Sequence, residues 1–234
     1  MRGAAMLLVL AACNGDPGEP DQGVTYRDGS DGGPNSGERG NLNISEILWS
    51  GSVSNDGSWD PLDQFVEIRN EGNRPINLSG WILQIDGSAS ATWRVPKMDE
   101  ALRPGDHLFI ATKDTGCFRE PDLLLPQLHI PYGDPFRLML RDADERLIEP
   151  AGSLEHPPYA GGYDLVESRS MEKIQLMFGG RGSEPHSWHF YTPIPVDVPN
   201  NDQVAADCRR YTLASPGRPN SPDYSGAFAS GSLE

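Results

Sequence analysis

The sequence predicts an all-β fold, built as a sandwich or a barrel of short strands. The 234 residues include 26 glycines and 21 prolines, which favour many turns, and only 37% are hydrophobic. Short runs with alternating apolar and polar residues recur along the chain, and no long apolar stripe with helical spacing appears. About nine such runs, in a chain long enough for one sizeable domain, predict this architecture.

The first thirteen residues, MRGAAMLLVLAAC, are typical of an exported protein. Arg2 precedes an apolar run at 4–12 that is too short to span a bilayer. The run ends in Leu-Ala-Ala followed by Cys13, which resembles the bacterial lipobox, where cleavage precedes the cysteine and the cysteine receives the lipid. We expect a lipoprotein signal peptide at 1–12 and a lipid anchor on Cys13. The alternative is an ordinary secretory signal followed by a coincidental cysteine.

A lipid on Cys13 would attach the protein to a membrane of the bacterial cell envelope, because several acyl chains anchor a protein durably. In the enterobacterial form of this system an Asp after the lipidated cysteine favours the inner membrane. Asn14 stands at that position, so we expect the outer membrane. The domain could face either the periplasm or the cell surface. The Gly-, Pro- and acid-rich residues 13–41 predict a flexible linker rather than a calcium site, and 223–234 predict a disordered tail.

The expected strands follow one another from residue 43 to residue 193, and Gly, Pro, Asn or Asp separates nearly all of them. In QFVEIRN, Val66 and Ile68 share the core face, while Glu67 and Arg69 share the other face. The runs are NISEILW (43–49), QFVEIRN (64–70), WILQID (81–86), ATWRVP (91–96), DHLFIAT (106–112), PFRLMLRD (135–142), RLIEP (146–150), MEKIQLMF (171–178) and WHFYTP (188–193).

Two turns support this reading. The polar residues 71–73 reverse the chain before Ile76 and Leu78, which should point inward again. Trp81 then begins a run whose apolar side chains fall on one face, so we expect it in the core. The segment RDADERL (141–147) predicts a hairpin with a polar tip.

Taken in order, these elements resemble the lamin tail domain family. The resemblance rests on ISEILW, the pair FVEIRN and INLSGWIL, LRPGDHLFIAT, the hairpin RLMLRDADERLIE, SRSMEKIQ followed by a Trp, and the closing SPGRPN. It covers 42–222 and implies an immunoglobulin-like β-sandwich in an exported or surface-attached bacterial protein. It also implies a non-catalytic domain that serves binding or envelope scaffolding. The segments 117–134, 150–168 and 193–210 depart from the family pattern and look like insertions.

Cysteine usage fits an exported chain. If Cys13 carries the lipid, Cys117 and Cys208 remain as an even pair, and no CxxC or Cys/His metal spacing competes for them. We expect one disulfide between Cys117 and Cys208, which would join two of the insertions. The alternative is a pair of free buried thiols.

The net charge of -15, with 34 acidic against 19 basic residues, argues against nucleic acid as a partner. A phosphate backbone is bound by clustered Lys and Arg, and an acidic protein repels it. We therefore expect the membrane, through the lipid, and an unidentified protein or polysaccharide as partners.

The segment NDGSWDPLD (55–63) is the best candidate for an ion-binding loop. Its hard oxygen donors near a glycine turn, Asn55, Asp56, Asp60 and Asp63, are ligands that calcium prefers, although their spacing does not match an EF-hand. An acidic surface loop is the alternative. Trp59 in the same loop is a candidate for an exposed ring that stacks on a sugar or a peptide.

Motifs of enzyme chemistry are scarce. The sequence contains no GxSxG elbow, no HExxH helix and no phosphate-binding glycine loop, so we assign no catalytic residue and no metal site. His186 and His189 in HSWH could contact one metal, but no third ligand is evident. The alternative functions are a metal-dependent hydrolase that uses Asp56, Asp60, His186 or His189, and a calcium-dependent carbohydrate-binding module. No cofactor other than the covalent lipid is expected.

Overall fold

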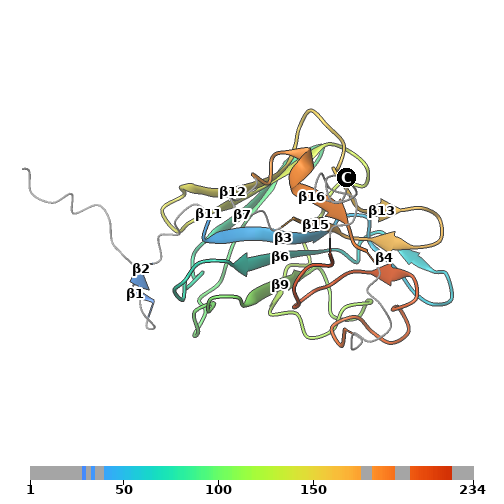
Figure 1. Cartoon of the computed structure of the whole chain (residues 1–234), viewed down its shortest axis with the longest axis horizontal. Coiled ribbons are helices and arrows are strands. Elements are labelled where there is room, and N and C mark those ends of the chain that lie inside the picture. The colour runs from blue at the N-terminus through green and yellow to red at the C-terminus, as the bar shows by residue number, and fades with distance from the viewer. Residues whose placement is uncertain (1–27, 30–32, 35–39, 175–180, 193–200, 223–234) are drawn as a thin grey trace, which may run out of the picture.

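The computed structural model describes residues 28–29, 33–34, 40–174, 181–192 and 201–222, and this part of the chain is almost entirely β-structure (Figure 1). Its one helical element is a 3-10 turn, η1 (Pro185–Ser187). No helix among the described residues is long and apolar enough to cross a membrane. The predicted signal peptide at 1–12, Cys13 and the tail at 223–234 lie outside the described residues.

Two sheets form an immunoglobulin-like sandwich, with β3, β6 and β9 in front of β7, β11 and β12 in Figure 1. Within these two sheets, neighbouring strands are antiparallel except for the edge strand β10, which runs parallel to β9. In spatial order, the larger sheet contains β10 (Leu123–Leu124), β9 (His107–Ala111), β6 (Phe65–Asn70), β3 (Leu42–Leu48), β15 (Met171–Lys173) and β16 (Trp188–Phe190). The smaller sheet contains β12 (Leu147–Ser153), β11 (Phe136–Arg141), β7 (Ile82–Gly87) and β8 (Ala91–Arg94).

Several short strands pair outside the two main sheets. A small sheet joins β13 (Gly162–Tyr163), β14 (Ser168–Arg169) and β17 (Thr212–Leu213), and β4 (Ser52–Val53) pairs with β5 (Trp59–Asp60). Within the predicted linker, β1 (Asp28–Gly29) pairs with β2 (Gly33–Pro34), a pairing that the sequence did not predict.

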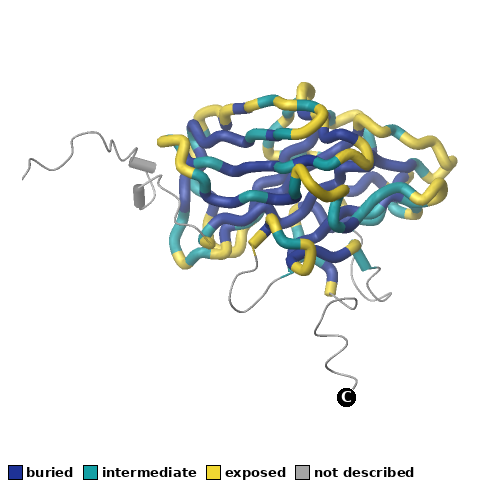
Figure 2. Tube along the Cα trace, turned by 90° about the horizontal axis from the view of Figure 1, so that it is seen from above, coloured by how far each residue is buried: buried dark blue, intermediate teal, exposed yellow. Residues whose placement is uncertain are grey.

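The core lies between the two sheets, where the strands in Figure 2 are buried and the connecting loops are exposed. Period-two alternation directs the apolar side chains of both sheets into this space, as predicted for Val66 and Ile68. Ile76, Leu78 and Trp81 are also buried there, which confirms their predicted direction. The same cluster contains Trp49, Trp93 and Trp188.

A bulge in β3 sets the direction of its polar residues. Ile44 faces Ile68 across the strand pair and Glu46 faces Glu67, so Ser45 is the extra residue. Simple alternation would place Glu46 on the same side as Ile44. The bulge instead turns Glu46 away from the core and onto the outer face of the sheet, beside Glu67.

The outer face of the larger sheet is covered as well. A second apolar cluster lies there and includes Phe65, Phe109 and Phe118, whose rings meet edge to face with centroids 4.9 to 6.0 Å apart. Residues 204–214 pack on these rings, and the disulfide between Cys117 and Cys208, with Cα atoms 5.6 Å apart, belongs to the cluster. The predicted disulfide is therefore confirmed, and it joins two segments that look like insertions.

One expected strand is shorter than predicted. The run 171–178 was expected to be one strand, but β15 ends at Lys173, and 175–180 lie outside the described residues. The outer face of QFVEIRN carries Glu67, as expected from the alternation, and Glu67 is completely buried there because the C-terminal part of the chain covers it.

Candidate functional site

The side chains of the 55–63 loop make separate local hydrogen bonds. Asn55 Nδ2 donates to the carbonyl oxygen of Ala206 at 3.1 Å. Asp56 accepts hydrogen bonds from the Ser54 hydroxyl and the Ser58 N–H, at 2.6 and 2.9 Å. These bonds lower the pKa of Asp56 to about 2, so this carboxylate stabilises its own turn.

The other two aspartates of the loop also have internal partners. Asp60 forms an ion pair with Lys113, with Oδ2 2.5 Å from Nζ. Asp63 is buried and accepts hydrogen bonds from the Ser52 hydroxyl and the Cys117 N–H, at 2.5 and 2.6 Å, while burial raises its pKa. Among the described residues, no three or more His, Cys, Asp or Glu side chains are grouped to hold a metal. The calcium hypothesis receives no support from this arrangement.

Three aromatic rings gather beside this loop, and we call Trp59, Tyr132 and Tyr163 the aromatic platform. Trp59 stacks on Tyr163, with centroids 4.7 Å apart and an interplanar angle of 16°. Tyr132 meets Trp59 edge to face at 5.3 Å and also contacts the buried ring of Trp49 at 5.6 Å. Trp59 remains 37% exposed and Tyr132 47% exposed. The predicted exposure of Trp59 is confirmed, and it belongs to a cluster.

Three segments distant in the sequence build the aromatic platform. Trp59 lies in β5, Tyr132 in the 117–134 segment, and Tyr163 in β13 of the 150–168 segment. The β4 and β13 strands lie at the same end of the sandwich, on the right in Figure 1. Two of the three rings are therefore supplied by segments that look like insertions in the family pattern.

An open cavity of about 310 Å³ adjoins the aromatic platform at Tyr163. Its polar wall contains the ion pair between Arg169 and Glu167, whose side chains are 37% and 22% exposed, together with Asp164. Phe190, half exposed at the edge of β16, supplies an apolar wall. Its volume is at the lower end of the range for small-ligand pockets.

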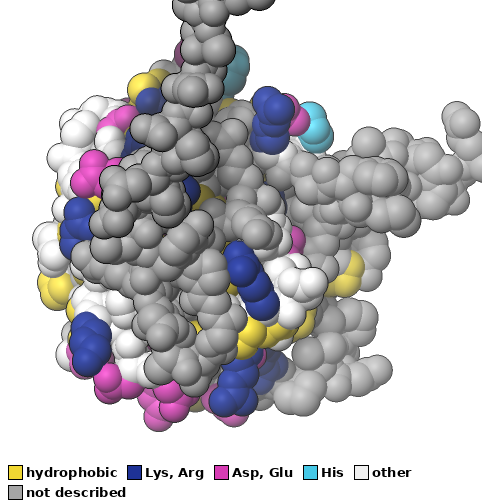
Figure 3. Space-filling view, turned by 90° about the vertical axis from the view of Figure 1, so that its left-hand side faces the viewer, with side chains coloured by type: hydrophobic (Ala, Val, Ile, Leu, Met, Phe, Trp, Pro, Cys, Tyr) yellow, Lys and Arg dark blue, Asp and Glu magenta, His cyan; other side chains and the backbone are white. Residues whose placement is uncertain are grey.

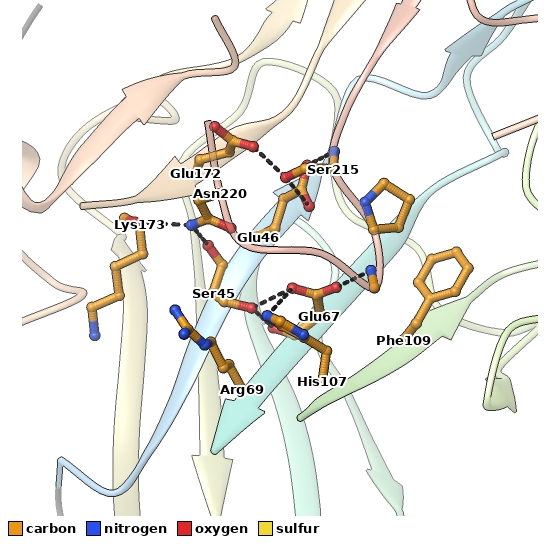
Figure 4. A network of polar contacts seen from close by, with 12 residues as sticks. Ser45, Glu46, Glu67, Arg69, His107, Phe109, Glu172, Lys173, Ser215 and Asn220 are labelled. Carbon is orange, nitrogen blue, oxygen red and sulfur yellow. Dashed lines mark hydrogen bonds and ion pairs between the residues drawn. The ribbon is translucent and has the colours of Figure 1, made fainter. Parts of the chain in front are cut away.

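A second polar assembly lies under the C-terminal part of the chain (Figure 4). Glu46 on β3, Glu67 on β6 and Glu172 on β15 project from neighbouring strands onto the outer face of the larger sheet, and all three are completely buried. We call them the carboxylate cluster. Its members are far apart in the sequence and meet only because these strands are adjacent.

The closing segment, residues 215–221, covers the carboxylate cluster. The N–H of Ser215 donates to Glu46 at 2.8 Å, and its hydroxyl contacts both Glu46 and Glu172. The N–H of Ser221 donates to Glu172 at 3.0 Å, and its hydroxyl contacts the same carboxyl group. Ser215, the first residue of the SPGRPN motif, and Ser221, directly after the motif, thus bind buried acids.

The environment of the carboxylate cluster favours protonated acids. Burial raises the pKa of Glu67 to about 8, although hydrogen bonds from Ser45 and Gly217 oppose the rise. Burial also raises the pKa values of Glu46 and Glu172, and the neighbouring carboxylates add to the rise at Glu46. Because a serine hydroxyl has a single proton, the contacts of Ser215 with two carboxyl groups require a proton on one of those groups.

The predicted histidine pair is divided between two environments. His186 is exposed and lies 3.0 Å from a Glu184 oxygen, whereas His189 is buried, with Nε2 3.7 Å from Glu172. The described residues supply no third ligand that would complete a metal site with them.

The sequence did not predict most members of the aromatic platform or the burial of the carboxylate cluster. Tyr132 and Tyr163 lie in Gly- and Pro-rich segments, where no periodicity marks them. Glu67 was assigned to an outer polar face, and nothing in the sequence showed that the closing segment returns to cover it.

Part of the chain matches a known protein family. Residues 35–149 match a family model described as the Lamin Tail Domain. The matched segment runs from β3 into the first residues of β12 and includes Glu46, Trp59, Glu67 and Tyr132. A search of curated proteins found no significant match.

Proposed function

This chain belongs to the lamin tail domain family, and we propose that it is a lipid-anchored protein of the bacterial cell envelope that presents this domain as a non-catalytic binding module. The anchor is proposed on the apolar run that ends at Cys13 and on the linker of residues 13–41. The disulfide between Cys117 and Cys208 is compatible with an oxidising compartment outside the cytoplasm.

The observation that carries the binding role is the exposure of the aromatic platform. Tyr and Trp side chains dominate binding surfaces, because each combines a large rigid apolar area with a polar group. Here three such rings contact one another at the surface instead of filling the core. A cluster of partly exposed rings beside a cavity marks a surface built for recognition.

The charge of the surface also limits the partner. Lys and Arg side chains lie among Asp and Glu on the face drawn in Figure 3. The net charge of -15 repels polyanions, so the proposed partners are a protein or a polysaccharide and not a nucleic acid.

Metabolic labelling with an alkyne fatty acid tests the proposed anchor in a bacterial host that expresses the full chain. The wild-type protein should carry the label and sediment with the outer membrane, whereas Cys13→Ala should be unlabelled and leave the membrane fraction. Protease treatment of intact and lysed cells then reports which side the domain faces. An unlabelled wild-type protein in the soluble fraction would overturn the proposal.

A further inference from the structure

We propose that the aromatic platform and the adjoining cavity together bind a neutral oligosaccharide. This inference names the ligand class of the binding module and rests on the proposed function above. The apolar faces of sugar rings would pack on the aromatic rings, and sugar hydroxyls would bond to the polar wall of the cavity.

The chemistry of the exposed Trp59 ring supports a sugar ligand. The indole N–H of Trp59 donates to the carbonyl oxygen of Ser50 at 2.8 Å, so its polar group already has an internal partner. The exposed 37% of Trp59 therefore offers mainly carbon surface. Because Tyr163 stacks on this ring and Tyr132 meets it edge to face, the platform is held in place before a ligand arrives.

The polar wall beside Tyr163 also supports a sugar ligand. Arg169 donates through Nε and a second guanidinium nitrogen to Oε1 of Glu167, and Asp164 accepts the N–H groups of Val166 and Glu167. A guanidinium group donates hydrogen bonds and a carboxylate accepts them, so this pair can bond to neighbouring hydroxyls that do both. Such convergent polar groups on an otherwise aromatic site fix the orientation of a small ligand.

The net charge of the protein and the size of the cavity favour neutral sugars over acidic polymers and peptides. The net charge of -15 disfavours acidic polymers, which leaves neutral sugars. A peptide is the competing occupant, since Leu165 and Val166 are strongly exposed beside the cavity. The charged wall and the small cavity of about 310 Å³ suit a hydroxylated ring better than an apolar peptide side chain.

The test is a binding assay with the full chain, purified in detergent. The probes are chitin and cellulose oligosaccharides as neutral ligands, oligogalacturonate as an acidic ligand, and a random heptapeptide library. Trp59→Ala and Tyr163→Ala remove platform rings, and Trp59→Phe keeps an aromatic ring. Leu124→Ala, which removes an exposed apolar side chain from the edge strand β10, is the matched control. Circular dichroism confirms that each variant is folded.

Neutral oligosaccharides should bind the wild type, with an affinity reduced at least about tenfold by Trp59→Ala or Tyr163→Ala, since hot-spot aromatics typically contribute this much. Trp59→Phe should retain part of the affinity, and Leu124→Ala all of it. Binding of only the peptides or the acidic probe overturns the ligand class, and neutral binding that survives both alanine variants overturns the site. No binding of any probe overturns the inference. The proposed lipid anchor is tested independently, by fatty-acid labelling at Cys13.

Discussion

The main-chain N–H of Gly217 donates a hydrogen bond of 2.5 Å to Oε2 of Glu67. This contact joins the closing segment to β6, 150 residues earlier in the chain. Gly217 has a φ of +70°, a conformation that other residues rarely adopt, and this lets the chain turn over the carboxylate cluster. The same buried carboxyl group accepts the Ser45 hydroxyl at 2.7 Å, so Glu67 connects the β3 bulge to the closing segment.

The raised pKa of Glu67 predicts that stability falls as the pH rises. The pKa is about 8 in the folded protein and 4.5 as a free group, so near pH 7 the folded state holds a proton that the unfolded state has lost. Stability from this group is complete below pH 4.5 and is lost as the pH rises towards 8. Chemical denaturation should show a loss of about 1–2 kcal/mol between pH 6.5 and 8.

His107, whose titration changes stability in the opposite direction, does not titrate between pH 6.5 and 8 in the folded protein. Burial lowers the pKa of His107 to about 4, so its contribution to stability falls as the pH drops below 6.5 and does not change above it. Glu67→Gln should reduce the fall in stability between pH 6.5 and 8 without abolishing it, because burial also raises the pKa values of Glu46 and Glu172, whereas Glu155→Gln, at an exposed site, should leave the pH dependence unchanged. An equally steep slope in Glu67→Gln would show that another group is responsible.

Removing the Ser215 hydroxyl should loosen the closing segment. Ser215→Ala leaves oxygens of Glu46 and Glu172 without their shared partner in a buried site, which should cost about 1–3 kcal/mol in the free energy of unfolding. Ser88→Ala removes an exposed hydroxyl that contacts Asp134 and should cost less than about 0.5 kcal/mol. Equal stability of Ser215→Ala and Ser88→Ala would contradict a role for the cluster in holding this segment.

The sequence predicted the sandwich because its signals are local. Alternation in β6 places Val66 and Ile68 in the core, and the polar residues 71–73 mark the chain reversal after this strand. The burial of Glu67 could not be predicted in this way. It depends on a β3 bulge that turns Glu46 outward and on a segment that returns from the end of the chain, and neither leaves a periodic pattern.

The candidate binding surface was predicted only at Trp59. That ring could be recognised because it stands in a polar loop, where an apolar core role is improbable. Its partners Tyr132 and Tyr163 lie about 70 and 100 residues further along, in irregular segments whose spatial meeting depends on the whole sandwich. Only the structure shows that the three rings are one surface.

The disulfide should stabilise the cover on the outer face of the larger sheet. The double variant Cys117→Ala, Cys208→Ala opens a link across 91 residues and should lose about 2–5 kcal/mol of stability. Denaturation of the wild type with a reducing agent should give a similar loss. Cys13→Ala retains the bridge and should match the oxidised wild type. A double variant as stable as the wild type would mean that the packing of Phe118 and Val204 suffices without it.

Calcium should leave the stability of the 55–63 loop unchanged. Asp56 and Asp60 would have to exchange their present partners, two serines and Lys113, for the ion, and Asp63 is buried against the Cys117 N–H. The melting temperature should therefore be the same with a chelator and with calcium at about 1 mM, a concentration that occupies typical extracellular sites. A ligand that binds only the folded state raises the melting temperature, and the rise grows with the logarithm of ligand concentration above its dissociation constant. A rise with calcium that disappears in Asp56→Asn, Asp60→Asn would restore the calcium-dependent carbohydrate-binding alternative and place its ion in this loop.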